Sequence, residues 1–252
     1  MIFEMNIIAH SFPPFVDTGN RAFTHFLNII SKFLKASDDA IETIILVSDN
    51  YVLIPVEKNA EHDRRALKEP STKPVRDITD EYCPNGSDLN GNPEMIYQLI
   101  CYLLNRFAIH VAAMSINGIA TGTNLPSIYI TCPSRRVSAV DATVVIRGVA
   151  YHPGDNVLLN GAASNHPAKF ADGEGEICAW LWASWLHSKN EFSRILINSI
   201  DTDNIGIAML MKSGLKARVV IALQSVTRGA TRTLRTFDCA PLSEYVCVYT
   251  AM

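Results

Sequence analysis

Two uninterrupted apolar runs that end in acids constrain the fold of this chain more than any other feature. "IETIILVSDN" spans residues 41–50 and "RILINSIDTD" spans residues 194–203, with Asp49 near the end of the first and Asp201 and Asp203 at the end of the second. A short apolar run without alternation is typical of a strand that is covered on both faces, as in parallel sheets. Because parallel strands need long crossover connections, we expect an α/β chain.

Helices and further strands are predicted between and around these two runs. Apolar residues at helical spacing, or charged pairs four residues apart, predict helices over residues 20–35, 57–69, 93–114 and 176–188. Asn92 and Pro93 supply an N-cap and a first-turn proline for the third helix, and the glycine-dotted residues 115–126 are predicted to form a loop. Strands are predicted over residues 2–9, 127–132, 142–151, 217–225 and 245–251. The fold class is therefore α/β, with a central, mostly parallel twisted sheet.

Length and composition limit the class of protein. A chain of 252 residues with 48% apolar residues can bury one core, so we expect a single domain over residues 1–252 with an irregular insertion around 70–169. The net charge of −3 argues against a general polyanion binder, although the last 49 residues are locally basic. Six cysteines without a CxxC pair argue against a zinc motif and a disulfide framework and favour reduced, buried thiols.

Membrane insertion and secretion are not expected. Arg106 and His110 interrupt the longest apolar stretch, and the N-terminal segment carries Glu4 and no basic leader. We therefore expect a soluble intracellular protein, cytoplasmic or nuclear and not secreted. Its compact form would suit a viral or mobile-element protein.

Acids gather where the predicted strands end. Glu4 lies in the first strand, Asp49 ends the second, Asp201 and Asp203 follow a later strand, and Glu174 and Glu176 open the helix before it. Ligands of open parallel sheets bind beyond the carboxyl ends of the strands, so these six carboxylates are predicted to converge. Each acid taken alone is more simply explained as a turn or cap residue, whereas the joint ExE and DxD pattern is harder to obtain by chance.

Convergent carboxylates indicate a cation site. They stay ionised together only when positive charge compensates them, and their hard oxygen atoms favour Mg²⁺ or Mn²⁺ over zinc. Two such ions can hydrolyse a phosphodiester without a protein nucleophile. The pattern therefore indicates metal-dependent nuclease chemistry.

The same residues resemble a known family. "GEGEICAWLWASWL…RILINSIDTDNIGIAML" is similar to the internal motif of the flap endonuclease and XPG family and of the 5′→3′ exoribonucleases. "ILVSDNYVLIPVEKNAEHDRRALKE" resembles the second motif of that family, and "MIFEMNIIAH" resembles the first. The resemblance implies a three-layer PIN-like fold, two divalent ions, and residues around 70–169 as a variable arch or lid.

The resemblance also assigns roles residue by residue. It implies that metals are held by Asp49, Glu174, Glu176, Asp201 and Asp203, with Glu4 standing where the family has aspartate and Asp238 as the last acid of the set. Lys58, Arg64 and Arg65 correspond to the basic residues that hold the scissile phosphate. The chain ends about 50 residues after Asp203, which leaves little room for the family's duplex-gripping element. We therefore expect a substrate of single-stranded, branched or RNA character at least as much as a DNA flap.

Two alternatives remain open from sequence. A PIN-like module with impaired catalysis, which binds RNA or a protein partner, would also carry these motifs. Trp180, Trp182 and Trp185 could form a base-stacking platform, but three tryptophans on so apolar a helix are more simply core residues.

Overall fold

The computed structural model describes most of the chain. The described residues are 1–13, 16–35, 41–49, 76–85, 89, 92–121, 125–134, 143–160, 167, 169–170, 174–189, 194–216, 218–227 and 230–241. The helix predicted at 57–69 and the strand predicted at 245–251 lie outside them.

One mixed sheet organises the described residues. Its strand order is β6-β3-β2-β1-β7-β8-β9. The strands are β1 (Ile2–Glu4), β2 (Thr43–Val47), β3 (Ser127–Thr131), β6 (Asn156–Leu158), β7 (Ile195–Ser199), β8 (Val219–Thr227) and β9 (Ala230–Asp238). Neighbours from β3 to β8 are parallel, and the edge strands β6 and β9 pair antiparallel. The predicted α/β class with a mostly parallel sheet is confirmed.

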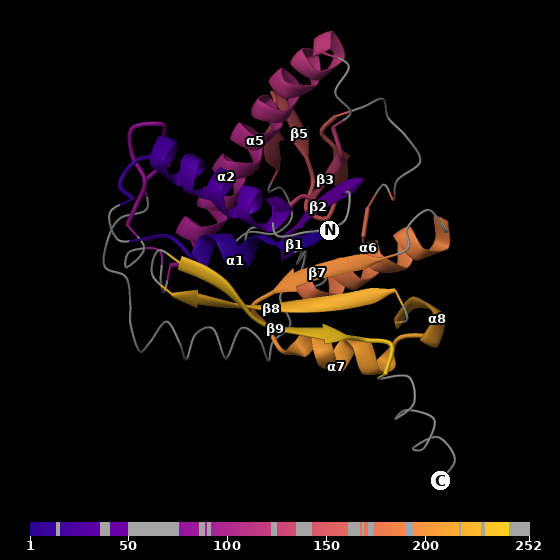
Figure 1. Cartoon of the computed structure of the whole chain (residues 1–252). Helices are drawn as coiled ribbons and strands as arrows, with labels where there is room; N and C mark the ends of the chain where they lie inside the picture. The colour runs from indigo at the N-terminus through magenta and orange to yellow at the C-terminus, as the bar shows by residue number, and fades with distance from the viewer. Residues whose placement is uncertain are drawn as a thin grey trace.

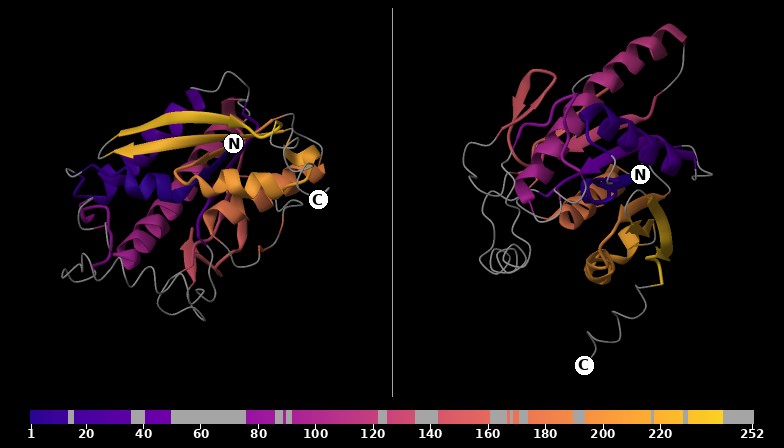
Figure 2. Two further views of the ribbon diagram at one scale, coloured as in Figure 1. Left: turned by 90° about the horizontal axis from the view of Figure 1, so that it is seen from below. Right: turned by 90° about the vertical axis from the view of Figure 1, so that its left-hand side faces the viewer.

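Helices cover both faces of this sheet. They are α1 (Met5–His10), α2 (Gly19–Lys35), α5 (Pro93–Thr121), α6 (Gly175–Lys189), α7 (Asp203–Leu210) and α8 (Ser213–Lys216). α2 and α5 lie on one side of the sheet, and α6 and α7 lie on the other (Figures 1 and 2). The layers are therefore helix, sheet and helix.

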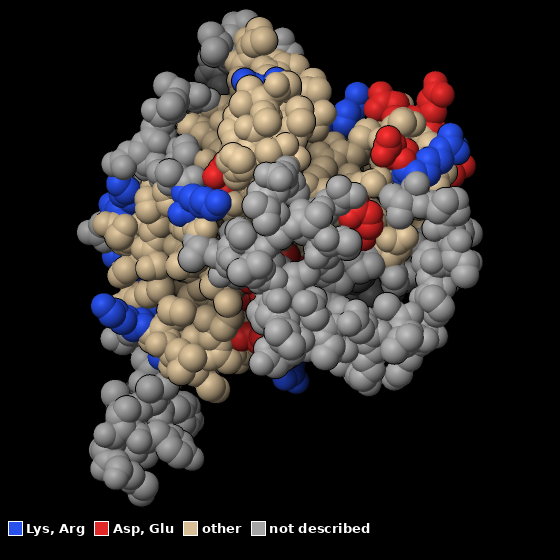
Figure 3. Space-filling model, turned by 180° about the vertical axis from the view of Figure 1, so that it is seen from behind, with Lys and Arg blue, Asp and Glu red and all other residues tan. Residues whose placement is uncertain are grey.

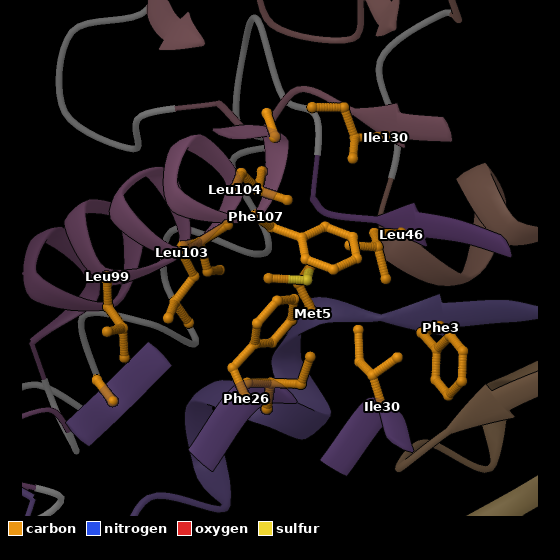
Figure 4. Close-up of a cluster of buried hydrophobic side chains, with 14 of the residues drawn as sticks. Phe3, Met5, Phe26, Ile30, Leu46, Leu99, Leu103, Leu104, Phe107 and Ile130 are labelled. Carbon is orange, nitrogen blue, oxygen red and sulfur yellow. The ribbon is translucent and has the colours of Figure 1, made fainter. Parts of the chain in front are cut away.

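Alternation along the buried strands divides the core in two. Phe3 and Leu46 face α2 and α5, where Phe3 lies beside Ile30 and Leu46 beside Phe107 (Figure 4). Ile2 and Ile45 belong instead to the cluster around α6. Successive side chains of a strand point to opposite faces, so continuous apolar runs are what a sheet covered on both faces requires.

The long helix α5 differs from its prediction at one end. It begins as expected, with Asn92 Oδ1 accepting a hydrogen bond from the Met95 amide at 3.2 Å. It then continues through Thr121, so the loop predicted from residue 115 is wrong for residues 115–121. Gly118 does not stop the helix, because one interior glycine costs only about 1 kcal/mol.

Within the described residues, α5 also contains one stretch, Glu94–Ile116, long and apolar enough to cross a membrane by length and composition alone. Arg106 and His110 lie inside this stretch and do not make it too polar or too short. The core helices of soluble proteins pass the same test. One face of α5 packs in the core, where Leu99, Leu103 and Leu104 are buried.

Two further predictions change. Residues 2–9 are not one strand, because β1 ends at Glu4 and α1 follows directly. The strand predicted at 142–151 is a separate hairpin of β4 (Val144–Ile146) and β5 (Val149–Tyr151), turned by Arg147 and Gly148 at φ of 51° and 78°. Positive φ at both turn residues is the geometry that two-residue hairpins favour.

The segment predicted as an insertion contributes to the main body. α5, β3 and β6 all lie within residues 70–169, and β3 and β6 are strands of the sheet. Residues 93–121, 127–131 and 156–158 therefore belong to the main body of the fold. Their apolar side chains complete the core on the β3 side.

Candidate functional site

Three adjacent parallel strands bring acidic residues to one edge of the sheet. β1 lies between β2 and β7, with Ile2 opposite both Ile45 and Ile197, and Glu4 opposite Val47. The carboxyl ends of the three strands are therefore level. Side chains two residues apart in a strand point to the same face. Glu4 therefore shares a face with Ile2, and Asp49 shares one with Ile45, and this is the face that carries α6.

The start of α6 lies against these two acids. The Gly175 amide donates a 2.9 Å hydrogen bond to Asp49 Oδ1. A methyl group at Gly175 would lie 3.4 Å from Asp49 Oδ1 and 3.7 Å from Glu4 Cγ. These are ordinary van der Waals distances, so a methyl group would fit, and they show how near the start of α6 lies to both side chains.

The two glutamates flanking Gly175 differ in position. Glu174 precedes the helix, and its carbonyl accepts the Cys178 amide at 3.0 Å. Glu176 lies in the first turn and is buried, 8% exposed. Two acids at this spacing do not share a helical face, and the structure places one before the helix and one inside it.

Burial and like charge act together on two of the carboxyl groups. Burial, the Glu176 charge and the Asp49 charge raise the pKa of Glu4 to about 8, although hydrogen bonds from Ser199 and Asn204 oppose the rise. Burial, with the charges of Asp49, Glu174 and Asp201, raises the pKa of Glu176 to about 7. Glu4, Asp49, Glu174, Glu176 and Asp201 are therefore one interacting group of carboxylates.

The DxD pair lies in the turn between β7 and α7. Asp201 Oδ1 accepts the Asp203 amide at 3.0 Å at the start of α7. Asp201 is half-buried and faces Glu176 electrostatically, whereas Asp203 is exposed. Of the pair, Asp201 thus belongs to the interacting group, and Asp203 lies beside it.

Two neutral residues complete the site, and sequence reasoning missed both. Asn204 is fully buried, and its Nδ2 donates to Glu4 Oε1 at 2.8 Å and to Ser199 Oγ at 2.9 Å. Ser199 Oγ also accepts the Asp201 amide at 2.9 Å. Their only sequence signal is position, because Ser199 and Asn204 flank the DxD pair.

Two buried oxygen atoms at this edge have no hydrogen-bond partner. They are Asn204 Oδ1 and Ser48 Oγ, the second next to Asp49 in the chain. Buried polar atoms are nearly always paired, so these two oxygen atoms are exceptions among the described residues.

The remaining predicted site residues lie elsewhere. Asp238 pairs with Val220, which is level with Leu196 at the amino-terminal end of β7. β9 is antiparallel, so its last residue reaches the edge opposite Asp201, and Asp238 is not part of the acidic group. Lys58, Arg64 and Arg65 lie outside the described residues.

The Cys178 thiol, which lies near these acids, is not activated as a nucleophile. Cys178 is fully buried, and burial together with the charges of Asp49 and Glu176 raises its pKa to about 12. Trp180 and Trp182 are buried in the core behind the site, which confirms the structural interpretation for these two tryptophans.

The donor set fits a hard divalent cation in kind and charge. Its oxygen atoms come from carboxylates, with one unpaired amide oxygen beside Glu4. As they lie, no three Asp, Glu, His or Cys side chains among the described residues are gathered closely enough to hold a metal ion. Like-charged carboxylates repel at short range, so bringing these oxygen atoms together requires positive charge.

Charge is unevenly distributed over the surface. On the face seen from behind, Lys and Arg groups recur along the left margin, Asp and Glu groups lie nearer the middle, and groups of both signs lie at the upper right (Figure 3). The net charge of −3 thus hides regions of both signs.

Comparison of the chain with protein-family models, with curated proteins and with solved structures finds no match.

Proposed function

We propose that this protein is a nuclease of PIN-like fold that depends on Mg²⁺ or Mn²⁺ and hydrolyses phosphodiester bonds. The observation that carries the proposal is the convergence of Glu4, Asp49, Glu176 and Asp201, from four separate segments, on one sheet edge. The mostly parallel sheet supports it, because ligands of such sheets bind beyond the carboxyl ends of the strands.

The raised pKa values support a cation as the missing partner. Glu4 already has two neutral donors, Ser199 and Asn204, yet its pKa remains raised to about 8. Neutral hydrogen bonds therefore do not offset burial beside Glu176 and Asp49. A divalent cation would offset both, since it carries the opposite charge at full strength.

Each residue has a role in this proposal. Glu4, Asp49, Glu176 and Asp201 would hold the cation, and Glu174 and Asp203 flank them. Bound there, the ion would supply an activated water and polarise the phosphodiester. Lys58, Arg64 and Arg65 are proposed to neutralise the phosphate, following the motif order of the resembling family.

Cleavage assays with a matched pair of variants test the function. Labelled single-stranded DNA, DNA flap and RNA substrates are incubated with Mn²⁺ and the wild-type protein, with Asp201→Ala/Asp203→Ala, or with Asp238→Ala. We expect cleavage by the wild type, a loss of at least about 100-fold in the double variant, and little change in Asp238→Ala, because Asp238 lies at the opposite edge. Cleavage that survives the double change would refute the proposal.

The alternative from sequence is an outcome of the same experiment. Tight binding of RNA without cleavage, together with no Mn²⁺ uptake by calorimetry, would point to a binding module with impaired catalysis. The substrate that is cut would decide between DNA and RNA.

A further inference from the structure

Asn204 connects two segments that are distant in sequence. It is the second residue of α7 and is fully buried. Its Nδ2 donates to Glu4 Oε1, 200 residues earlier, and to Ser199 Oγ at the end of β7. Both amide hydrogens are thus used in contacts outside the backbone of its own helix.

Local helix capping does not explain this arrangement. The N-cap residue of α7, Thr202, makes no side-chain cap hydrogen bond, and Asp201 Oδ1 accepts the Asp203 amide instead. Glu4 likewise makes no side-chain cap at the start of α1. The Asn204 and Glu4 side chains therefore bond to each other, and neither caps the helix end at which it lies.

Ser199 links the Asn204 side chain to the backbone of Asp201. Its Oγ accepts from Asn204 at 2.9 Å and from the Asp201 amide at 2.9 Å, so its two acceptor sites are filled. Its own hydrogen has two acceptors within reach, Asp201 O at 3.3 Å and the Glu4 carboxylate. The Glu4 carboxylate is therefore fixed relative to the backbone of Asp201.

Glutamate needs this support more than aspartate does. Its side chain has one more rotatable bond, so an unsupported Glu4 carboxylate would sample several positions relative to Asp49 and Asp201. A small displacement of a ligand is enough to weaken a metal site.

We propose that Asn204 is a positioning residue that fixes the Glu4 carboxylate relative to Asp201, so that both can contact one divalent cation. The inference rests on the proposed function, because it assigns Asn204 a role in that same site. Residues that orient metal ligands typically change metal affinity by 10- to 100-fold when they are replaced.

Calorimetric titration with Mn²⁺ tests the role without an activity assay. Asn204→Leu keeps a similar volume and removes both donated hydrogen bonds, and we expect it to weaken Mn²⁺ binding at least about tenfold. Asn160→Leu is the control. Asn160 Nδ2 donates to Pro126 O and its Oδ1 accepts from the Ile128 amide, both at the amino-terminal end of β3. Its loss is expected to lower stability without changing Mn²⁺ affinity.

Exchanging the side-chain lengths at positions 4 and 204 distinguishes a loss of carboxylate positioning from a general loss of protein stability. Glu4→Asp withdraws the carboxylate by one methylene, and Asn204→Gln extends the amide by one. We expect Glu4→Asp alone to weaken Mn²⁺ binding and Glu4→Asp/Asn204→Gln to recover most of the loss. Circular dichroism and urea unfolding of the metal-free variants show which of them fold, and if Asn204→Leu does not fold, the length exchange decides the question alone.

The outcomes distinguish this inference from the function on which it rests. Wild-type Mn²⁺ affinity in folded Asn204→Leu, or a double variant no better than Glu4→Asp, overturns the positioning role alone. A wild-type protein that takes up no Mn²⁺ overturns the proposed cation site, and the positioning role with it.

Discussion

His25 is a titratable residue whose environment is set by a few neighbours. Its Nε2 lies 3.1 Å from Ser11 O and 3.2 Å from Ser11 Oγ, and its ring packs 5.2 Å from that of Phe12. Burial lowers the pKa of His25 from its usual value, the Ser11 carbonyl opposes the fall, and Lys32 adds to it. The folded state therefore favours the neutral imidazole.

The sign of the pH dependence follows from this direction. The unfolded chain binds a proton at His25 near pH 6.5, and the folded protein binds it only at lower pH. The contribution of neutral His25 is therefore complete above about pH 6.5 and is lost as the pH falls toward the folded-state pKa. We predict that wild type loses stability relative to His25→Gln between pH 7.5 and 5.5. Urea unfolding at several pH values measures the difference, and a difference that stays flat would contradict the prediction.

Residue patterns predicted the core better than they predicted the polar network. The helical spacing of apolar residues over 20–35 predicted an amphipathic helix, and Phe26 and Ile30 on one face of α2 are buried. Asn204 and Ser199 were not recognised. Neutral polar residues carry no spacing rule, and their partners are fixed only by the tertiary arrangement of β1, β7 and α7.

At the scale of elements, a buried hydrogen-bonded chain joins α6 to two strands. Trp182 Nε1 donates to Thr131 Oγ1 at 2.8 Å, and Thr131 Oγ1 donates to Asn156 Oδ1 at 2.8 Å. All three residues are buried. The contact holds the helix that carries Glu176 against β3 and β6.

Replacing the shared hydroxyl group tests this connection. Thr131→Val keeps the shape but leaves the Trp182 N–H and the Asn156 carbonyl unpaired, which we expect to lower the free energy of unfolding by about 2–3 kcal/mol. Thr131→Ser keeps the hydroxyl and loses only a methyl group, at a cost of about 1 kcal/mol. Urea unfolding monitored by tryptophan fluorescence compares the two. If the valine variant is the more stable one, the hydrogen-bonded chain does not hold the helix in place.

Elements were predicted well where burial gave a clear signal. β2, β3, β7 and α2 match their predicted segments to within a few residues, because each is a continuous apolar run or an amphipathic helix. β9, "ATRTLRTFD", was missed because an edge strand alternates polar residues and needs no apolar run. β1 was predicted too long because "MNIIAH" is apolar enough for a strand yet forms α1.

At the scale of the whole molecule, the direction of each strand decided which acids meet. Acids that follow parallel strands reach one edge, so the convergence of Glu4, Asp49 and Asp201 could be anticipated from sequence. Asp238 could not be placed, because nothing in its sequence shows that β9 runs back antiparallel. The same strand direction explains why the site combines residues nearly 200 positions apart.

This arrangement stores repulsion in the folded protein. Glu176 is 8% exposed and faces Asp49, Glu174 and Asp201. Glu176→Gln removes one buried charge and keeps the shape, so the metal-free variant should be more stable than wild type by on the order of 1 kcal/mol. Glu81→Gln, at an exposed position, is the control and should change little.

Addition of Mn²⁺ should reverse the order of stability of wild type and Glu176→Gln. A ligand at 100 times its Kd stabilises the folded state by about 2.7 kcal/mol, which corresponds to a rise in Tm of about 5–10 °C for a chain of this size. We expect that rise in wild type and Glu81→Gln, and a much smaller one in Glu176→Gln, which lacks one proposed ligand. Thermal unfolding with and without Mn²⁺ measures all three. If Glu176→Gln is more stable than wild type without Mn²⁺ and responds to Mn²⁺ as strongly as wild type, the cation binds away from Glu176. If instead Glu176→Gln is the more stable protein without Mn²⁺ and the less stable one with it, the cation binds where the carboxylates repel one another.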